Sequence, residues 1–117
     1  MIKTLLSLLS VVFFLIASSN ILCAAEARGV SGNTVIIGMI MDQTGPAAEV
    51  GIPYGKGVKN YFGHINDTGG INGRKIKVIL EDDRYTIPAA IAAFKKLVFR
   101  DKVLGIMFCG GTGQNTA

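Results

Sequence analysis

The sequence predicts an α/β fold in which a parallel sheet carries helices on both faces. Three apolar segments, residues 35–41, 75–81 and 103–108, have the length of buried strands, and two amphipathic segments, 53–66 and 88–100, lie between them. This β-α-β-α-β order gives a parallel sheet when the crossovers are right-handed. In such a sheet, ligands bind at the carboxyl ends of the strands.

The amino-terminal residues predict an export signal. Lys3 supplies a positive end, an apolar run from Leu5 to Ile16 follows, and small residues lead to Ala25. The order is that of a secretory signal peptide, and the apolar run is shorter than the ~20 residues that span a membrane. We therefore predict a signal peptide over residues 1–25 with cleavage after Ala25, or alternatively after Ala27; a retained membrane anchor is the other interpretation.

The two cysteines predict neither a lipid anchor nor a disulfide. Cys23 is preceded by Leu22, where a lipoprotein signal has a small residue, so lipidation is not expected. Cleavage leaves Cys109 alone, and we expect a buried free thiol.

Cleavage of the signal peptide also lowers the net charge of the chain from +4 to +3, because Lys3 is the one charged residue removed. The remaining basic residues are scattered, so a nucleic acid partner is not expected.

The first half of the mature chain predicts a lead-in, a strand and a helix. Residues 26–33 are the lead-in, and the run Val-Ile-Ile-Gly-Met-Ile-Met at 35–41 is typical of a strand buried on both faces. Turn-forming residues 42–46 end this strand. Pro53 suits the first turn of a helix, and an apolar stripe continues that helix to residue 66: Tyr54, Val58, Tyr61, Phe62 and Ile65.

The second half repeats this alternation and ends in glycines. A loop at 67–73 leads to the strand at 75–81, and the Ala-rich helix at 88–100 follows. That helix has Ile91, Phe94, Leu97 and Val98 on one face. After the last strand, residues 109–117 turn into the start of another helix.

Two loops contain candidate functional residues. Gly110, Gly111, Thr112 and Gly113 precede a helix start, where free backbone N–H groups could bind a carboxylate or a phosphate; a simple tight turn is the alternative. The loop lacks the Lys-Ser/Thr pair of a nucleotide-binding loop.

The acidic run Glu81, Asp82 and Asp83 offers carboxylates, but adjacent strand residues point to opposite faces. The run could mimic a metal site or a paired-carboxylate acid and base, but we expect these side chains not to converge on one substrate atom. We expect them instead to serve helix capping, turn formation or hinge-side hydrogen bonding. His64 is expected on a helix surface. Neither a catalytic triad nor metal-ligand spacing is present in the sequence, so we expect no enzyme and no cofactor.

Five motifs in order resemble a known family. They are the strand and turn from Val35 to Pro46, the connection Ile65-Asn66 with Gly-Gly-Ile-Asn-Gly-Arg-Lys-Ile at 69–76, the turn Asp82-Asp83-Arg84-Tyr85 with Pro88, the segment Asp101-Lys102-Val103, and Gly111-Thr112-Gly113. Together they resemble type I periplasmic solute-binding proteins, which are similar to the leucine/isoleucine/valine-binding protein and serve ABC importers. The resemblance covers residues 34–117.

The resemblance implies a binding protein with two α/β lobes of flavodoxin- or Rossmann-like type that close on a small solute, often an amino acid of branched-chain type. Residues 34–117 would form part of the first lobe, so we expect the chain alone to bind solute poorly. The Gly110–Gly113 loop, with the Thr112 hydroxyl, would receive the ligand carboxylate, and Val50 would lie at the cleft edge. The implied location is the Gram-negative periplasm, and the implied partners are an ABC permease and ATPase.

Departures from the family pattern limit which ligand and which disulfide the resemblance implies for this chain. The branched-chain binders have an aromatic residue at the position of Val50 and a serine at that of Gly110, so a branched-chain ligand does not follow. They also pair a cysteine of the third-strand loop with one at the position of Tyr85, which leaves Cys109 a free thiol here. Two further hypotheses are a ligand-sensing domain of a receptor or regulator with this fold, and a small secreted hydrolase, for which no nucleophile and base were found.

Overall fold

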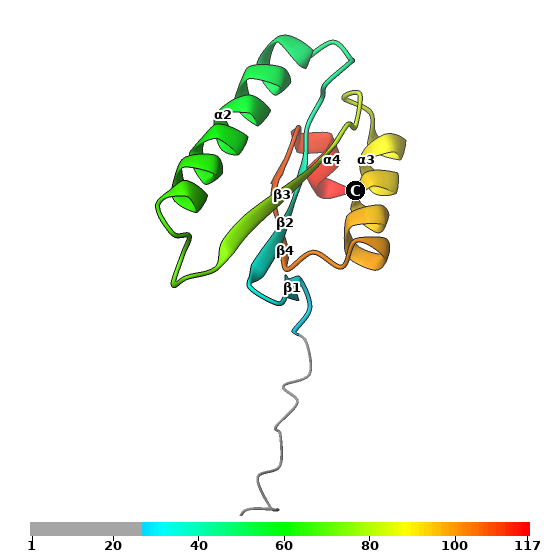
Figure 1. The fold of residues 1–117 in the computed structure, drawn as a ribbon. Helices are drawn as coiled ribbons and strands as arrows, with labels where there is room; N and C mark the ends of the chain where they lie inside the picture. The colour runs from blue at the N-terminus through cyan, green and yellow to red at the C-terminus, as the bar shows by residue number, and fades with distance from the viewer. Residues whose placement is uncertain (1–26) are drawn as a thin grey trace, which may run out of the picture.

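The computed structural model describes residues 27–117, which form one sheet flanked by helices (Figure 1). The predicted α/β class is confirmed. In chain order the elements are β1 (Val30–Ser31), β2 (Thr34–Ile40), α2 (Ala48–Asp67), β3 (Lys75–Glu81), α3 (Ile87–Lys95), a π-helical turn η1 (Lys96–Arg100), β4 (Gly105–Cys109) and α4 (Thr112–Thr116).

Strand β2 is the centre of the sheet. It pairs in parallel with β3, from Thr34 opposite Lys75 to Ile40 opposite Glu81, and its other edge pairs in parallel with β4. The short β1, which was predicted only as a lead-in, pairs antiparallel with the start of β2. Parallel pairing of three strands confirms the sheet type that the alternating pattern predicted.

The two long connections cross the sheet in opposite directions. The chain passes from β2 to β3 on one edge and then returns past β2 to β4 on the other. Right-handed crossovers in opposite directions place their helices on opposite faces, and Figure 1 shows α2 and α3 on either side of the sheet. The core cluster lies on the α3 face and contains Ile40, Ala93, Leu97 and Val103.

Helix α2 begins five residues earlier than predicted, so the expectation that Pro53 opens it was wrong. The carboxylate of Asp42 accepts hydrogen bonds from the backbone N–H groups of Gly45 and of Ala47, the latter at 2.6 Å. This turn orients the chain so that Ala48 already begins the helix. Pro53 falls inside the helix, where it lacks the N–H that would bond back along it.

The helix predicted over 88–100 is present as α3 and η1, but its buried face differs from expectation. Leu97 is fully buried, and an added Cβ at Gly38 of β2 would lie 2.9 Å from its Cδ1 atom. Phe94 is half exposed, whereas the small side chain of Ala93 is buried. The alanine surface allows α3 to approach the sheet closely, and the larger side chains turn outward. The third strand begins two residues later than predicted.

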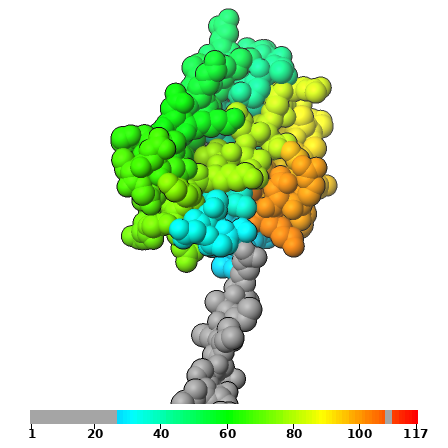
Figure 2. Space-filling model, in the orientation of Figure 1, coloured from blue at the N-terminus to red at the C-terminus, as the bar shows by residue number. Residues whose placement is uncertain are grey.

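Arg28 fixes the amino-terminal end of the described chain to the segment between α3 and β4. Its guanidinium donates to the carbonyl oxygens of Val98 and of Val103, the latter at 3.4 Å. Figure 2 shows the cyan segment that contains Arg28 beside the orange segment that contains η1. Residues 27–31 therefore belong to the folded unit.

Three sequence predictions fall outside the described residues. These are the signal peptide over residues 1–25, its cleavage after Ala25 and the state of the Cys109 thiol, whose side chain the structure does not describe. Within residues 27–117, none of the helices combines the length and apolar character that a membrane crossing requires.

Candidate ligand-binding site

Three loops meet at the carboxyl edge of the sheet. They follow β2, β3 and β4, and small residues bring them into contact. A Cβ added at Gly45, after β2, would lie 2.6 Å from the carbonyl oxygen of Arg84, after β3. A Cβ added at Gly111, after β4, would lie 3.2 Å from a ring carbon of Tyr85. Glycine at both positions therefore allows the loop after β3 to touch each of its neighbours.

The glycine loop after β4 is held against the turn after β3. A Cβ at Gly110 would lie 3.2 Å from Oδ2 of Asp83, and one at Gly113 would lie 3.5 Å from Cδ1 of Ile87. Gly111 precedes α4 with an extended backbone, and Thr112 begins that helix with an exposed side chain. The structure thus brings Gly110, Gly111, Thr112 and Gly113 to the edge that the sequence predicted.

Val50 lies on a different element from the other predicted site residues. It belongs to the first turn of α2, and its N–H donates to the carbonyl oxygen of Ala47 at 3.0 Å. Its side chain is 66% exposed, so it contributes an apolar surface to solvent at the carboxyl end of β2.

Asp42 is a buried structural residue of this edge, although its position in the sequence predicted only part of a turn. It is 2% exposed and lies two residues after the end of β2. Its Oδ1 accepts from the N–H groups of Thr44 and Gly45, and its Oδ2 accepts from that of Ala47. An aspartate directly after an apolar strand, followed by Thr-Gly-Pro, was the available sequence signal. The side chain replaces backbone partners in this turn.

Asp82 joins the loop after β2 to the turn after β3. Its Oδ1 accepts from the N–H groups of Gln43 at 2.8 Å and of Arg84 at 2.9 Å, while its Oδ2 accepts from the Thr44 hydroxyl at 2.6 Å. Burial raises the pKa of Asp82, but the hydrogen bond from Thr44, those from the two N–H groups and the charge of Arg84 together lower it below its ordinary value of 3.8. Asp82 is therefore held as a carboxylate.

Asp83 stabilises a strained part of the same turn. Arg84 and Tyr85 both have positive φ angles, 49° and 57°, in the left-handed region that L residues rarely adopt. Oδ1 of Asp83 accepts from the N–H of Tyr85 at 3.0 Å. Asp83 is fully buried, and among the described residues its Oδ2 has no hydrogen-bond partner.

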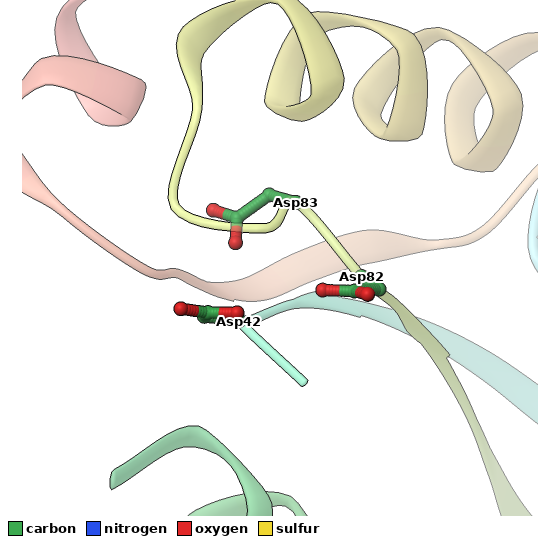
Figure 3. A group of neighbouring side chains, drawn as sticks. All are labelled: Asp42, Asp82 and Asp83. Atoms are coloured by element: carbon green, nitrogen blue, oxygen red, sulfur yellow. The ribbon is translucent and has the colours of Figure 1, made fainter. Parts of the chain in front are cut away.

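The acidic side chains converge, contrary to the expectation from strand alternation. One carboxylate oxygen each from Asp42, Asp82 and Asp83 lies within 4.8 Å of the other two, and Figure 3 shows the three side chains facing a common space. The prediction failed because β3 ends at Glu81, so Asp82 and Asp83 lie in a turn and do not alternate. Glu81 points away and forms an ion pair with Lys96.

An apolar groove of about 550 Å³ lies away from these loops, between α3, β4 and α4. Its lining includes Ile91, Phe94, Phe99 and Met107. Its position on the helix side of the sheet separates it from the polar edge, so it does not enlarge the candidate site.

Comparison with known proteins identifies related chains. A family described as periplasmic binding protein matches residues 34–117. An amino acid binding protein of Pseudomonas aeruginosa is 36% identical over 80 residues, covering 67% of this chain and 21% of the relative. A Leu/Ile/Val-binding protein homolog 4 of Brucella abortus is also 36% identical over 80 residues, covering 68% of this chain and 19% of the relative. The chain thus spans about a fifth of the length of these relatives.

Solved structures show the same arrangement. A fatty acid ABC transporter substrate-binding protein from Thermomonospora curvata superposes with a TM-score of 0.70 at 26% identity, covering 77% of this chain and 23% of that one. A branched-chain amino acid transporter substrate binding protein from Streptococcus pneumoniae, in complex with isoleucine, gives 0.66 at 28% identity, with 70% and 24% covered. A solute binding protein from Rhodopseudomonas palustris, in complex with 3,4-dihydroxy benzoic acid, gives 0.56 at 30% identity, with 64% and 20% covered.

Proposed function

The chain belongs to the periplasmic binding protein family, and on that premise we propose that it is part of the substrate-binding component of an ABC importer for a small carboxylate-bearing solute, with amino acids as the first candidates. Residues 34–117 would form part of the first of two lobes, and the loops after β2, β3 and β4 would supply one wall of the cleft. The proposed activity is binding, without a chemical step.

The contact between the three loops is the observation that carries this proposal. Gly110 lies against Asp83, Gly111 lies against Tyr85, and Gly45 lies against Arg84, so one continuous surface forms at the carboxyl ends of the strands. This edge is where open α/β sheets bind ligands. On this surface, the backbone N–H groups of residues 110–113 and the hydroxyl of Thr112 would hold an anionic group, and Val50 would form an apolar rim.

The solute class is supported by the relatives' ligands. Isoleucine, fatty acids and 3,4-dihydroxy benzoic acid, named for three related structures, share a carboxylate and differ in almost everything else. A site that holds the common group through backbone N–H donors would accept all three kinds of molecule. The remainder of the solute would then be distinguished by residues around that anchor, among them Val50.

Location and partners follow from the same premise. A signal peptide over residues 1–25, cleaved after Ala25, would deliver the protein to the periplasm. There it would present the solute to an ABC permease coupled to an ATPase.

The proposal is tested by nuclear magnetic resonance of the ¹⁵N-labelled chain. Leucine, isoleucine, valine and benzoate are titrated separately, and the amide signals of residues 110–113 are followed. We expect at least one of these solutes to shift these amides in a saturable way, because a bound carboxylate accepts hydrogen bonds from them. Weak affinity does not prevent detection, since the method reports millimolar binding.

A control ligand and a variant test whether the carboxylate and the Thr112 hydroxyl take part in binding. Leucinamide lacks the carboxylate of leucine but keeps its side chain, so it should leave the amides of residues 110–113 unshifted. Thr112→Val should weaken binding of the shifting solute several-fold if the hydroxyl donates to it. Shifts confined to other residues, or equal shifts with leucine and leucinamide, would contradict the proposed site.

A further inference from the structure

We propose that Asp42, Asp82 and Asp83, called here the aspartate cluster, form a binding site for a divalent cation and that Ca²⁺ fits it best. The cluster joins the turns that follow β2 and β3, and Asp83 lies against Gly110 of the candidate solute surface. The proposal rests on the carboxylates themselves and does not depend on which solute the protein binds.

The hydrogen bonds of the cluster leave acceptor capacity on one oxygen of each carboxylate. A carboxylate oxygen has two lone pairs. Oδ1 of Asp42 and Oδ1 of Asp82 each accept two backbone N–H groups and are therefore filled. Oδ2 of Asp42 accepts only from Ala47, and Oδ2 of Asp82 accepts only from Thr44. Each of these Oδ2 atoms keeps a lone pair that a cation can share.

Asp83 gives the independent reason to expect a ligand. Its side chain is fully buried, and its Oδ2 has no hydrogen-bond partner among the described residues. A buried carboxylate oxygen without a partner is costly, and buried charges are normally paired or coordinate metals. Figure 3 shows an oxygen of Asp83 directed toward Asp42, so this carboxylate faces the rest of the cluster. A cation there would neutralise it.

The ligand set favours Ca²⁺ over Mg²⁺. One oxygen from each of three carboxylates lies within 4.8 Å of the other two, so protein groups can supply at least three ligands to one ion. Ca²⁺ accepts about 6–8 oxygen ligands in flexible geometry, carboxylates among them. Mg²⁺ demands near-octahedral geometry and gives up its water reluctantly, so it is usually held by only about one or two carboxylates. Carboxylate oxygens suit these hard cations, whereas Zn²⁺ prefers nitrogen and sulfur ligands.

An ion bound by the aspartate cluster would connect the two loops that follow β2 and β3. Asp42 fixes the loop after β2, and Asp83 fixes the strained pair Arg84 and Tyr85. An ion shared by both carboxylates would hold these two loops together at the solute edge. Asp82 is partly exposed and Thr44 is exposed, so the ion can enter from their side.

The test titrates Ca²⁺ alone into the chain, purified with its metal removed by a chelator, and uses calorimetry and thermal unfolding. We expect one ion per chain with a Kd on the order of 10⁻⁴–10⁻³ M, the range of extracellular calcium modules. At ten times the Kd, the Tm should rise by roughly 5–10 °C. Mg²⁺ should bind at least about tenfold more weakly, because it gives up its bound water reluctantly and demands near-octahedral geometry.

Two variants identify the ligands. Asp83→Asn keeps the size of the side chain but removes its charge, and it should abolish the rise in Tm with Ca²⁺. Asp67→Asn makes the same exchange at an exposed position at the end of α2, and it should respond as the unaltered chain does. If Asp83→Asn fails to fold, the titration of the unaltered chain against Mg²⁺ still decides.

Absence of Ca²⁺ binding by the unaltered chain overturns the proposal, as does an undiminished response of Asp83→Asn. The titration contains no solute and the solute experiment contains no calcium. Failure of the cation site is therefore distinguishable from failure of the proposed solute function.

Discussion

Replacing Gly51 by alanine should destabilise the protein although the exchange favours a helix. Gly51 is buried in α2, and a Cβ added there would overlap the carbonyl oxygen of Asp42. Asp42 cannot yield easily, because it is 2% exposed and its carboxylate is held by three backbone N–H groups. Relief of the overlap therefore requires α2 to move away from the end of β2.

The magnitude follows from comparison with Gly57 on the same helix. An added Cβ at Gly57 has no atom within 4 Å, so Gly57→Ala should gain about 1 kcal/mol from helix propensity alone. Gly51→Ala receives the same gain but bears an overpacking cost of about 1–3 kcal/mol or more. The two variants should thus differ by at least about 1–3 kcal/mol, and each 1 kcal/mol is roughly 4–8 °C in Tm for a domain of this size.

The assay is urea unfolding of both variants and the unaltered chain, followed by far-ultraviolet circular dichroism. We expect the order of stability Gly57→Ala, unaltered chain, Gly51→Ala, with similar slopes against urea. If Gly51→Ala is as stable as Gly57→Ala, then α2 does not pack closely on the Asp42 carbonyl, and our account of how that helix is positioned is wrong.

Two further predictions concern the core and the site. Leu97→Ala should lower the free energy of unfolding by about 2–5 kcal/mol, because Leu97 is fully buried against Gly38. If urea unfolding shows that this free energy falls by less than about 1 kcal/mol, the packing of Leu97 against Gly38 is contradicted. Asp82→Asn should flatten the acid side of the stability profile. Because folding lowers the pKa of Asp82 below 3.8, the ionised side chain contributes to stability above that pH, and this contribution is lost as the pH falls further. The acid unfolding midpoints of the variant and the unaltered chain measure the loss. An unchanged dependence of stability on pH would contradict the Asp82 hydrogen bonds.

The strands were the most predictable part of the fold. Residues 75–81 form β3 as expected, and the apolar run from Val35 is β2 with a shift of one residue. Both segments are rich in apolar residues, many of them β-branched, and β2 is fully buried at its carboxyl end, so their composition alone indicates strands. The two-residue β1 has no such composition, and its pairing depends on its contact with β2.

Helix ends and side-chain convergence were less predictable, because they depend on contacts between distant residues. Pro53 suggested a helix start, but the carboxylate of Asp42 starts α2 earlier. Asp82 and Asp83 meet Asp42 from a loop forty residues away in the chain, and a local rule for strands could not show that. The glycine loop at 110–113 was predicted correctly at the carboxyl edge because topology alone places it there.

The central position of β2 has a consequence for biogenesis. β1, β3 and β4 all pair with β2, which is the most apolar strand and is synthesised well before β3 and β4. During synthesis, Val-Ile-Ile-Gly-Met-Ile is therefore present for some time without partners on its two long edges. Unpaired apolar strands readily associate with other chains. A chaperone that shields extended apolar segments would benefit this protein most while residues 34–40 await the arrival of residues 105–109.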